Sequence, residues 1–213
     1  MNHLHHTRLP YVPRGLRVGL LGGSFNPAHA GHLALSLFAL RRFRLDAVWW
    51  LVAPQNPLKS AYDMAPLATR LAGATALARH PRIKVLAPEA AWGCCYTVDM
   101  LHNLRQIRAG GRFVLLLGSD NWVQLPRWRH WRRIMGAVPV AVLRRDAYAG
   151  GLAGACEASA CYAFARRHPT DARNLATQTP PVWIMADNPR WAISATRIRQ
   201  QQRDRSAITW PPN

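Results

Sequence analysis

Six short apolar runs, separated by helix-length stretches, are the feature that most constrains the fold of this chain. The runs are nearly continuous in large apolar residues rather than alternating with polar ones. Such runs are typical of parallel strands that are covered on both faces. The repeated order of strand and helix favours parallel pairing through right-handed crossovers. The expected strands are Leu16–Leu21, Ala47–Val52, Ile83–Leu86, Phe113–Leu117, Val138–Leu143 and Val182–Met185.

The stretches between these runs predict helices. A length of 213 residues suits one domain, so we expect a single α/β domain built on a doubly wound parallel sheet. We expect a flexible tail over residues 1–15, the folded domain over 16–205 and a second tail over 206–213. The predicted helices span 31–43, 66–79, 98–108, 121–134, 157–167 and 195–203.

Composition narrows the class of protein without choosing a ligand. The chain has 28 Lys+Arg against 10 Asp+Glu, and its formal net charge of +18 suits nucleic acid, anionic lipid or nucleotide phosphates. A solvated basic surface explains the charge equally well. No apolar run approaches the roughly 20 residues that span a bilayer, and no signal peptide is evident. Four cysteines without paired CxxC spacing predict reduced thiols in a cytoplasmic protein.

The end of the first expected strand carries the strongest motif, Gly22-Gly23-Ser24-Phe25-Asn26-Pro27-Ala28-His29-Ala30-Gly31-His32. Its two glycines permit a tight turn and a close approach of backbone to a phosphate. A helix that begins near Ala30 would turn its free N–H groups to the same place. His29 and His32 are three residues apart, so their imidazoles lie on one side of the helix start. Imidazole N–H groups there can stabilise charge on a transferred phosphoryl group.

Three further strand ends carry polar residues. Lys59 lies in a Pro-bounded loop after the second strand, where an ammonium group suits a triphosphate and a solvated Lys is the alternative. Thr97 is a candidate helix N-cap after the third strand. Gly118 and Asp120 follow the fourth strand, where a tight turn can meet a ribose or adenine. A helix cap explains Asp120 equally well.

The run Ile193–Arg199 follows the last expected strand and predicts a second helix N-terminus. Ser194 suits the N-cap, and Thr196 adds a hydroxyl in the first turn. Arg199 would lie just over one turn further along. Hydroxyls, a helix N-terminus and a guanidinium together suit a phosphate, while an ordinary capped amphipathic helix is the alternative.

The run from Gly22 to His32 resembles the HxGH-motif nucleotidyltransferases, and more narrowly the bacterial nicotinate-nucleotide adenylyltransferases. The resemblance spans Leu16 to Arg199 and implies a Rossmann-like fold that transfers AMP from ATP to nicotinate mononucleotide and releases pyrophosphate. It also implies Mg²⁺ that accompanies ATP, with no metal site of protein ligands. The implied catalytic residues are His29, His32, Lys59 and Arg199. The residues implied to contact ATP are Gly22, Gly23, Ser24, Phe25, Gly118, Asp120, Ser194 and Thr196. The residues implied to contact nicotinate are Thr97 and Trp128, and the Trp128 ring would stack on the pyridine.

This chain departs from the family pattern at four places. The loop Gln55–Lys59 replaces the commoner Pro-Pro-His-Lys, and Met100 replaces the second Thr of Tyr-Thr-x-x-Thr-Leu. Ala195 replaces the second Ser of Ile-Ser-Ser-Thr-x-Ile-Arg. The run Arg144-Arg145-Asp146-Ala147 stands where Arg-Pro-Gly is common, so the role of that region stays open.

Two alternatives remain open. The first is an adenylyltransferase of the same superfamily with another acceptor, either phosphopantetheine or nicotinamide mononucleotide. The second is a non-catalytic basic protein that binds nucleic acid, which the charge and nine Trp residues favour and the intact His pair and Arg199 disfavour. The expected partners are ATP and nicotinate mononucleotide, without a membrane or nucleic acid, and homo-oligomerisation stays open.

Overall fold

The computed structural model describes residues 6, 8–54, 64–94, 96–107, 110–144 and 155–187. Six strands form where the six apolar runs predicted them, and their ends differ from the predicted ends by at most two residues. The strands are β1 (Arg17–Gly23), β2 (Ala47–Val52), β3 (Ile83–Leu86), β4 (Arg112–Gly118), β5 (Val140–Arg144) and β6 (Trp183–Asp187).

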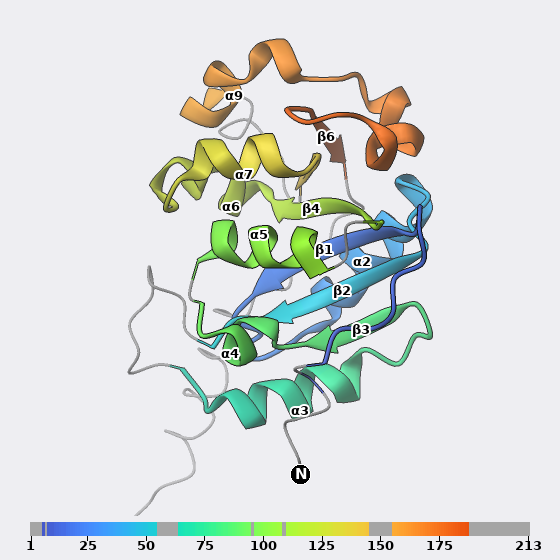
Figure 1. The fold of residues 1–213 in the computed structure, drawn as a ribbon, viewed down its shortest axis with the longest axis vertical. Helices are drawn as coiled ribbons and strands as arrows, with labels where there is room; N and C mark the ends of the chain where they lie inside the picture. The colour runs from blue at the N-terminus through green and yellow to red at the C-terminus, as the bar shows by residue number, and fades with distance from the viewer. Residues whose placement is uncertain are drawn as a thin grey trace, which may run out of the picture.

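All six strands belong to one parallel sheet with the order β3-β2-β1-β4-β5-β6 (Figure 1). The chain winds outward from β1 to β3, then crosses to β4 and winds outward on the other side. β1 and β4 are therefore the neighbours at which the direction of winding reverses. Ligands of open α/β sheets bind at the carboxyl ends of strands at such a point. The prediction of a doubly wound α/β sheet is confirmed.

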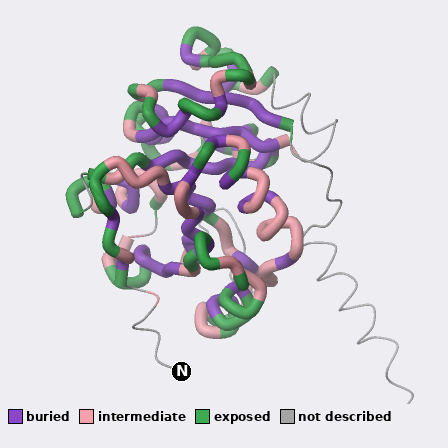
Figure 2. Tube along the Cα trace, turned by 90° about the vertical axis from the view of Figure 1, so that its right-hand side faces the viewer, coloured by how far each residue is buried: buried purple, intermediate pink, exposed green. Residues whose placement is uncertain are grey.

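Successive residues of each strand pack into two different core clusters. In β4, Phe113, Leu115 and Leu117 belong to one cluster, while Val114 and Leu116 belong to the other. Both faces of the sheet are thus buried, and Figure 2 shows the buried strands running through the molecule. Helices α5 (Thr97–Ile107), α6 (Ser119–Gln124) and α7 (Trp131–Ala137) contribute to the first cluster; α2 (Ala30–Arg42), α3 (Leu67–Leu77) and the 3-10 segment η4 (Pro169–Thr177) contribute to the second.

The stretch predicted as one helix over 121–134 is divided in the structure. It forms α6, the 3-10 turn η2 (Leu125–Arg127) and α7. Pro126 lacks the N–H that a continuing helix needs, and His130 adopts a left-handed φ of 51°. The prediction of a continuous helix is wrong here, and the break leaves Trp128 extended between two helices. The other short elements are α4 (Pro88–Trp92), α9 (Glu157–Cys161) and η3 (Ala163–Ala165).

The segment before β1 is held against the domain over its described residues. Leu9 and Val12 are buried in the first core cluster. Ala87 N donates a hydrogen bond to His6 O at 2.8 Å, beyond the end of the edge strand β3. This packing differs from the flexible tail predicted for residues 1–15, because the apolar side chains at positions 9 and 12 find partners in the core.

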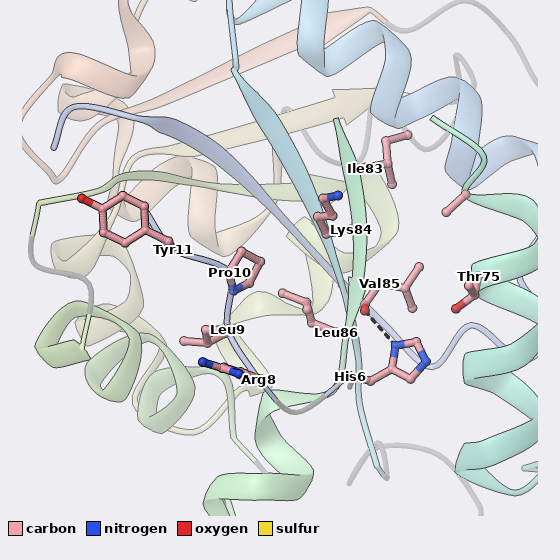
Figure 3. Close-up of a pocket in the computed structure, with 11 residues that line it drawn as sticks. His6, Arg8, Leu9, Pro10, Tyr11, Thr75, Ile83, Lys84, Val85 and Leu86 are labelled. Atoms are coloured by element: carbon pink, nitrogen blue, oxygen red, sulfur yellow. Dashed lines mark hydrogen bonds between the residues drawn. The ribbon is translucent and has the colours of Figure 1, made fainter. Parts of the chain in front are cut away.

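A hollow of about 670 Å³ lies between this segment, α3 and β3. Figure 3 shows His6 at its edge, where His6 Nδ1 and Val85 O are 3.0 Å apart. The polar ends of Arg8 and Lys84 point in different directions rather than toward one centre. None of the residues that line the hollow is a predicted site residue, so the hollow is separate from the strand ends that carry them.

Two further findings bear on the cysteines and on membranes. Cys161 is an exposed free thiol. Within the described ranges, none of the helices combines the length and the apolar character needed to cross a membrane.

Candidate functional site

The turn after β1 lies later in the sequence than Gly22 and Gly23, where the motif indicated it. Gly22 and Gly23 still belong to β1 and pair with β2, and Gly23 O accepts a hydrogen bond from Ala53 N at 3.0 Å. The prediction that these glycines form the turn is therefore wrong, because the sheet pairing continues through them. The chain turns instead at Phe25, whose φ is 48°. A Cβ placed at Gly22 would meet no atom of the described residues within 4 Å, so these residues leave the backbone there open to a ligand.

The two histidines of the motif lie together at the start of α2. His29 is the buried N-cap of the helix, and its Nδ1 accepts a hydrogen bond from Gly31 N at 3.2 Å. His32 Nδ1 accepts one from His29 N, also at 3.2 Å. A ring nitrogen that accepts an N–H carries no hydrogen, so each imidazole keeps its hydrogen on Nε2. The ring centroids are 4.0 Å apart, so the two imidazoles lie side by side at the start of α2.

Aromatic packing fixes the position of His32. The Phe25 and His32 rings are 4.7 Å apart, and Phe25 stacks on Trp50 with centroids 5.2 Å apart. Trp50 Nε1 donates to Ser36 Oγ at 2.7 Å, and Ser36 Oγ donates to His32 O at 2.8 Å. The side chain of Phe25 is buried, so only its backbone is accessible to a ligand. Phe25 therefore supports the histidine pair from inside the core.

Arg70 of α3 holds the turn after β1 against the end of β2. Its Nη1 donates to Ser24 O and to Ala53 O, each at 2.7 Å. Its Nη2 donates to Pro54 O at 2.7 Å, and its Nε donates to Ala65 O at 2.8 Å. The side chain is buried, and burial lowers the pKa of the guanidinium. An arginine nevertheless stays protonated in proteins, so a buried cation organises these two loops.

Arg70 was not predicted as a site residue, although its sequence position carries a signal. Leu67, Arg70, Leu71 and Ala74 follow the i, i+3, i+4, i+7 spacing of one helix face. The face is apolar except for Arg70, and a charge at a core position needs partners inside the protein. The pattern could have indicated a buried arginine without identifying its partners.

The end of β4 adjoins the turn after β1 because the two strands are neighbours in the sheet. Gly118 and Ser119 are buried there, and Asp120 is exposed in the first turn of α6. An exposed carboxylate at the point where the winding reverses suits the hydroxyls of a ribose. The structure thus puts Gly118 and Asp120 at the carboxyl end of the sheet, where the histidine motif also lies.

The two residues predicted to bind nicotinate lie in segments that contact each other. Thr97 is the first residue of α5 rather than its N-cap, which corrects the prediction by one position. The Arg129 guanidinium carbon lies 4.8 Å from the centroid of the Tyr96 ring. This contact joins the residue before Thr97 to the residue after Trp128. Trp128 is half-buried against the first core cluster, so part of its indole ring is accessible.

Like Arg70, Glu89 is a buried ionisable residue that was not predicted from the sequence. It lies in α4, between the end of β3 and the start of α5, with a residue exposure of 8%. Loss of hydration raises the pKa of its carboxyl to about 7. A carboxyl with this pKa changes its charge near neutral pH.

Several predicted site residues lie outside the described part of the chain. These are Lys59, Ser194, Thr196 and Arg199, and the roles assigned to them stay predictions. The departure at Arg145–Ala147 also lies outside it. Among the described residues, no group of three or more His, Cys, Asp or Glu side chains is arranged to hold a metal ion.

Comparison with known proteins shows close relatives over nearly the whole chain. The cytidylyltransferase-like family model matches residues 20–201. The chain is 50% identical over 182 residues to a protein of Cereibacter sphaeroides described as a probable nicotinate-nucleotide adenylyltransferase, covering 85% of this chain and 96% of the relative. A relative with the same description from Mesorhizobium japonicum is 41% identical over 192 residues, covering 90% and 98%.

Solved structures share the fold. The nicotinic acid mononucleotide adenylyltransferase of Plasmodium falciparum complexed with APC has a TM-score of 0.59 at 14% identity, covering 86% of this chain and 82% of that chain. The same protein complexed with NaAD has a TM-score of 0.57 at 15% identity, with the same coverage. The sheet order, the histidine motif and relatives at 41–50% identity lead to one assignment. The chain belongs to the nicotinate-nucleotide adenylyltransferases of the cytidylyltransferase-like family.

Proposed function

We propose that this protein transfers the AMP part of ATP to nicotinate mononucleotide, giving deamido-NAD and pyrophosphate in NAD biosynthesis. The observation that carries the proposal is the His29–His32 pair, which puts two imidazoles side by side beyond the carboxyl end of β1. A doubly wound sheet binds its ligand at the carboxyl ends of its strands. The relatives at 41–50% identity carry the name of this activity.

In this reaction an oxygen of the nicotinate mononucleotide phosphate forms a bond to the α-phosphorus of ATP. The bond from that phosphorus to the oxygen bridging toward the β-phosphorus breaks, and pyrophosphate leaves with the electron pair. Negative charge grows on the oxygens around the α-phosphorus, and His29 and His32 stabilise it by donating from Nε2. The open backbone at Gly22 lets the triphosphate approach β1 closely. Lys59, Ser194, Thr196 and Arg199 complete the proposed triphosphate site.

We assign the pyridine ring of the acceptor to the region of Trp128 and Thr97. The accessible part of the Trp128 indole provides a flat apolar surface for stacking. Arg129, which lies over the Tyr96 ring, brings a positive charge to this region. A cation there favours the carboxylate of nicotinate over the neutral amide of nicotinamide.

Magnesium enters the proposal with the substrate. Mg²⁺ usually keeps several waters and is bound through substrate phosphates rather than by a cage of protein ligands. The ion would reach the site bound to the phosphate oxygens of ATP, where it neutralises part of their charge. We place the reaction in the cytoplasm, where an exposed thiol such as Cys161 stays reduced.

Replacing Trp128 by alanine is expected to raise the KM for nicotinate mononucleotide about fivefold, because stacking on an aromatic ring contributes about 1 kcal/mol. The KM for ATP should change little. Steady-state kinetics with each substrate varied separately measures both values. Trp128→Phe is the matched control, since it keeps a flat ring and should retain most of the affinity. Equal KM values for nicotinate mononucleotide in wild type and Trp128→Ala would remove Trp128 from the acceptor site.

The function is tested by following pyrophosphate release from ATP and Mg²⁺ with one acceptor at a time. Release with nicotinate mononucleotide well above that with nicotinamide mononucleotide or phosphopantetheine is the expected result. Preferential release with either of the others would keep the transfer chemistry and overturn the assignment of Thr97 and Trp128. If no acceptor supports release, while RNA binds in a manner that weakens steeply with salt, the protein is a nucleic-acid-binding protein instead.

A further inference from the structure

Arg70 connects the loop that carries the histidine pair to the loop that follows β2. Two of its hydrogen bonds reach the ends of β1 and β2, at Ser24 O and Ala53 O, and both come from the same Nη1. A third reaches Pro54 O, the last described residue before the segment that contains Lys59. The fourth reaches Ala65 O, two residues before α3. One planar group thus sets the spacing of three backbone segments.

A second contact fixes the same turn. Asn26 Oδ1 accepts a hydrogen bond from Ala65 N at 3.3 Å, so residue 65 is bonded to Arg70 through its carbonyl and to the turn through its N–H. The φ of 48° at Phe25 is a strained conformation for a bulky residue, and it persists only where surrounding contacts hold it. The bonds to Ser24 O and to Asn26 Oδ1 flank Phe25 on both sides.

The partners of Arg70 indicate a role in geometry rather than in charge pairing. Among the described residues, its hydrogen bonds run to backbone carbonyls and none runs to a carboxylate. Carbonyls do not neutralise the guanidinium, so the buried positive charge persists close to the turn. The planar fork of an arginine reaches several acceptors in fixed directions, which a lysine ammonium cannot reproduce.

We propose that Arg70 is a positioning residue for the adenylyl transfer. It fixes the Ser24–Asn26 turn against the end of β2, and so it sets where the backbone of the turn and the His29–His32 pair stand relative to the α-phosphorus. The inference rests on the function proposed above. It differs from a purely stabilising role because the reaction rate of the folded enzyme depends on it. A misplacement of reacting groups by about 1 Å can cost on the order of 100-fold in rate.

The chain offers a matched control at the opposite end of β1. Arg17 is also held by several hydrogen bonds, since its Nε and Nη2 donate to Asp46 at 3.1 and 2.7 Å. It lies at the first residue of β1, whereas the turn follows the last. Arg17→Gln should therefore lower the stability of the domain without moving the turn.

The experiment compares Arg70→Lys, Arg70→Gln and Arg17→Gln with wild type, well below the melting temperature of each. We expect kcat per folded enzyme to fall about 10- to 100-fold in Arg70→Gln and less in Arg70→Lys, with a small change in the KM for nicotinate mononucleotide. Arg17→Gln should lower the Tm and leave kcat unchanged. If Arg70→Gln does not fold, Arg70→Lys decides the question. Unchanged kcat in a folded Arg70 variant with a lowered Tm would overturn the proposal.

Amide hydrogen exchange separates this proposal from the proposed function. Residues 23–32 should exchange faster in Arg70→Lys than in wild type, and they should be unaffected in Arg17→Gln. Wild type that shows no pyrophosphate release would refute the function, and the exchange result would still test whether Arg70 orders the turn. Wild type that is active while exchange and kcat are both unchanged in Arg70→Lys would refute the role of Arg70 alone.

Discussion

Replacing His32 by alanine is expected to lower the kcat of adenylyl transfer by about 100- to 1,000-fold, the usual cost of removing one donor that stabilises transition-state charge. The substitution removes the imidazole and its Nε2–H, while the stack of Phe25 on Trp50 remains. The fold should persist, because His32 is only partly buried at the start of one helix. Pyrophosphate release under saturating substrates measures the loss, and circular dichroism monitors the fold.

Two controls separate catalysis by His32 from its structural role. His32 Nδ1 also accepts a hydrogen bond from His29 N, so alanine removes a capping contact that contributes about 1 kcal/mol to the free energy of unfolding. His32→Asn retains an acceptor near this N–H and lacks the imidazole donor, so its kcat should stay low while stability recovers. His102→Ala removes an exposed histidine from α5 and should change neither quantity. Near-normal turnover in His32→Ala would show that His32 does not act on the reacting phosphate.

Most of the sheet was predictable because its strands are buried on both faces. Continuous apolar runs mark such strands without help from distant residues, and all six were found within two residues of their ends. The helix over 121–134 was harder, since Pro126 and the left-handed His130 interrupt an otherwise helical pattern. Pro126 was the local signal for that break. The packing of Leu9 and Val12 had no such signal, because a short segment becomes ordered only through the core it meets.

The candidate site also has parts that were predictable from the sequence and parts that were not. The His29–His32 pair was predictable because both residues and the helix start lie within one short motif. The turn was misplaced to Gly22 and Gly23, since local sequence does not show how far the pairing with β2 continues. The contact of Arg70 with Ser24 joins residues 46 positions apart, and that of Arg129 with Tyr96 depends on how α5 packs beside α7. Such contacts depend on the finished fold rather than on any local pattern.

Glu89 should make the stability of the domain depend on pH near neutrality. Burial raises the pKa of its carboxyl from 4.5 to about 7, because the charged form loses hydration inside the protein. Below pH 4.5 the carboxyl is protonated in both the folded and the unfolded chain, so its titration does not lower the free energy of unfolding. Between pH 4.5 and 7 only the unfolded chain ionises, so the free energy of unfolding falls as pH rises. Above pH 7 the loss in the free energy of unfolding is constant. It amounts to about 3 kcal/mol, because each unit of the rise in pKa contributes about 1.4 kcal/mol.

Replacing Glu89 by glutamine removes this titration, so the variant should gain stability over wild type as pH rises. The difference in the free energy of unfolding between Glu89→Gln and wild type should be about 2 to 3 kcal/mol larger at pH 8 than at pH 5. Urea unfolding at both pH values measures it, and any pH-independent effect of the amide cancels in the comparison. Glu157→Gln, at an exposed position in α9, should show the same difference at both pH values. A Glu89→Gln difference that does not change with pH would mean that the Glu89 carboxyl remains hydrated in the folded protein.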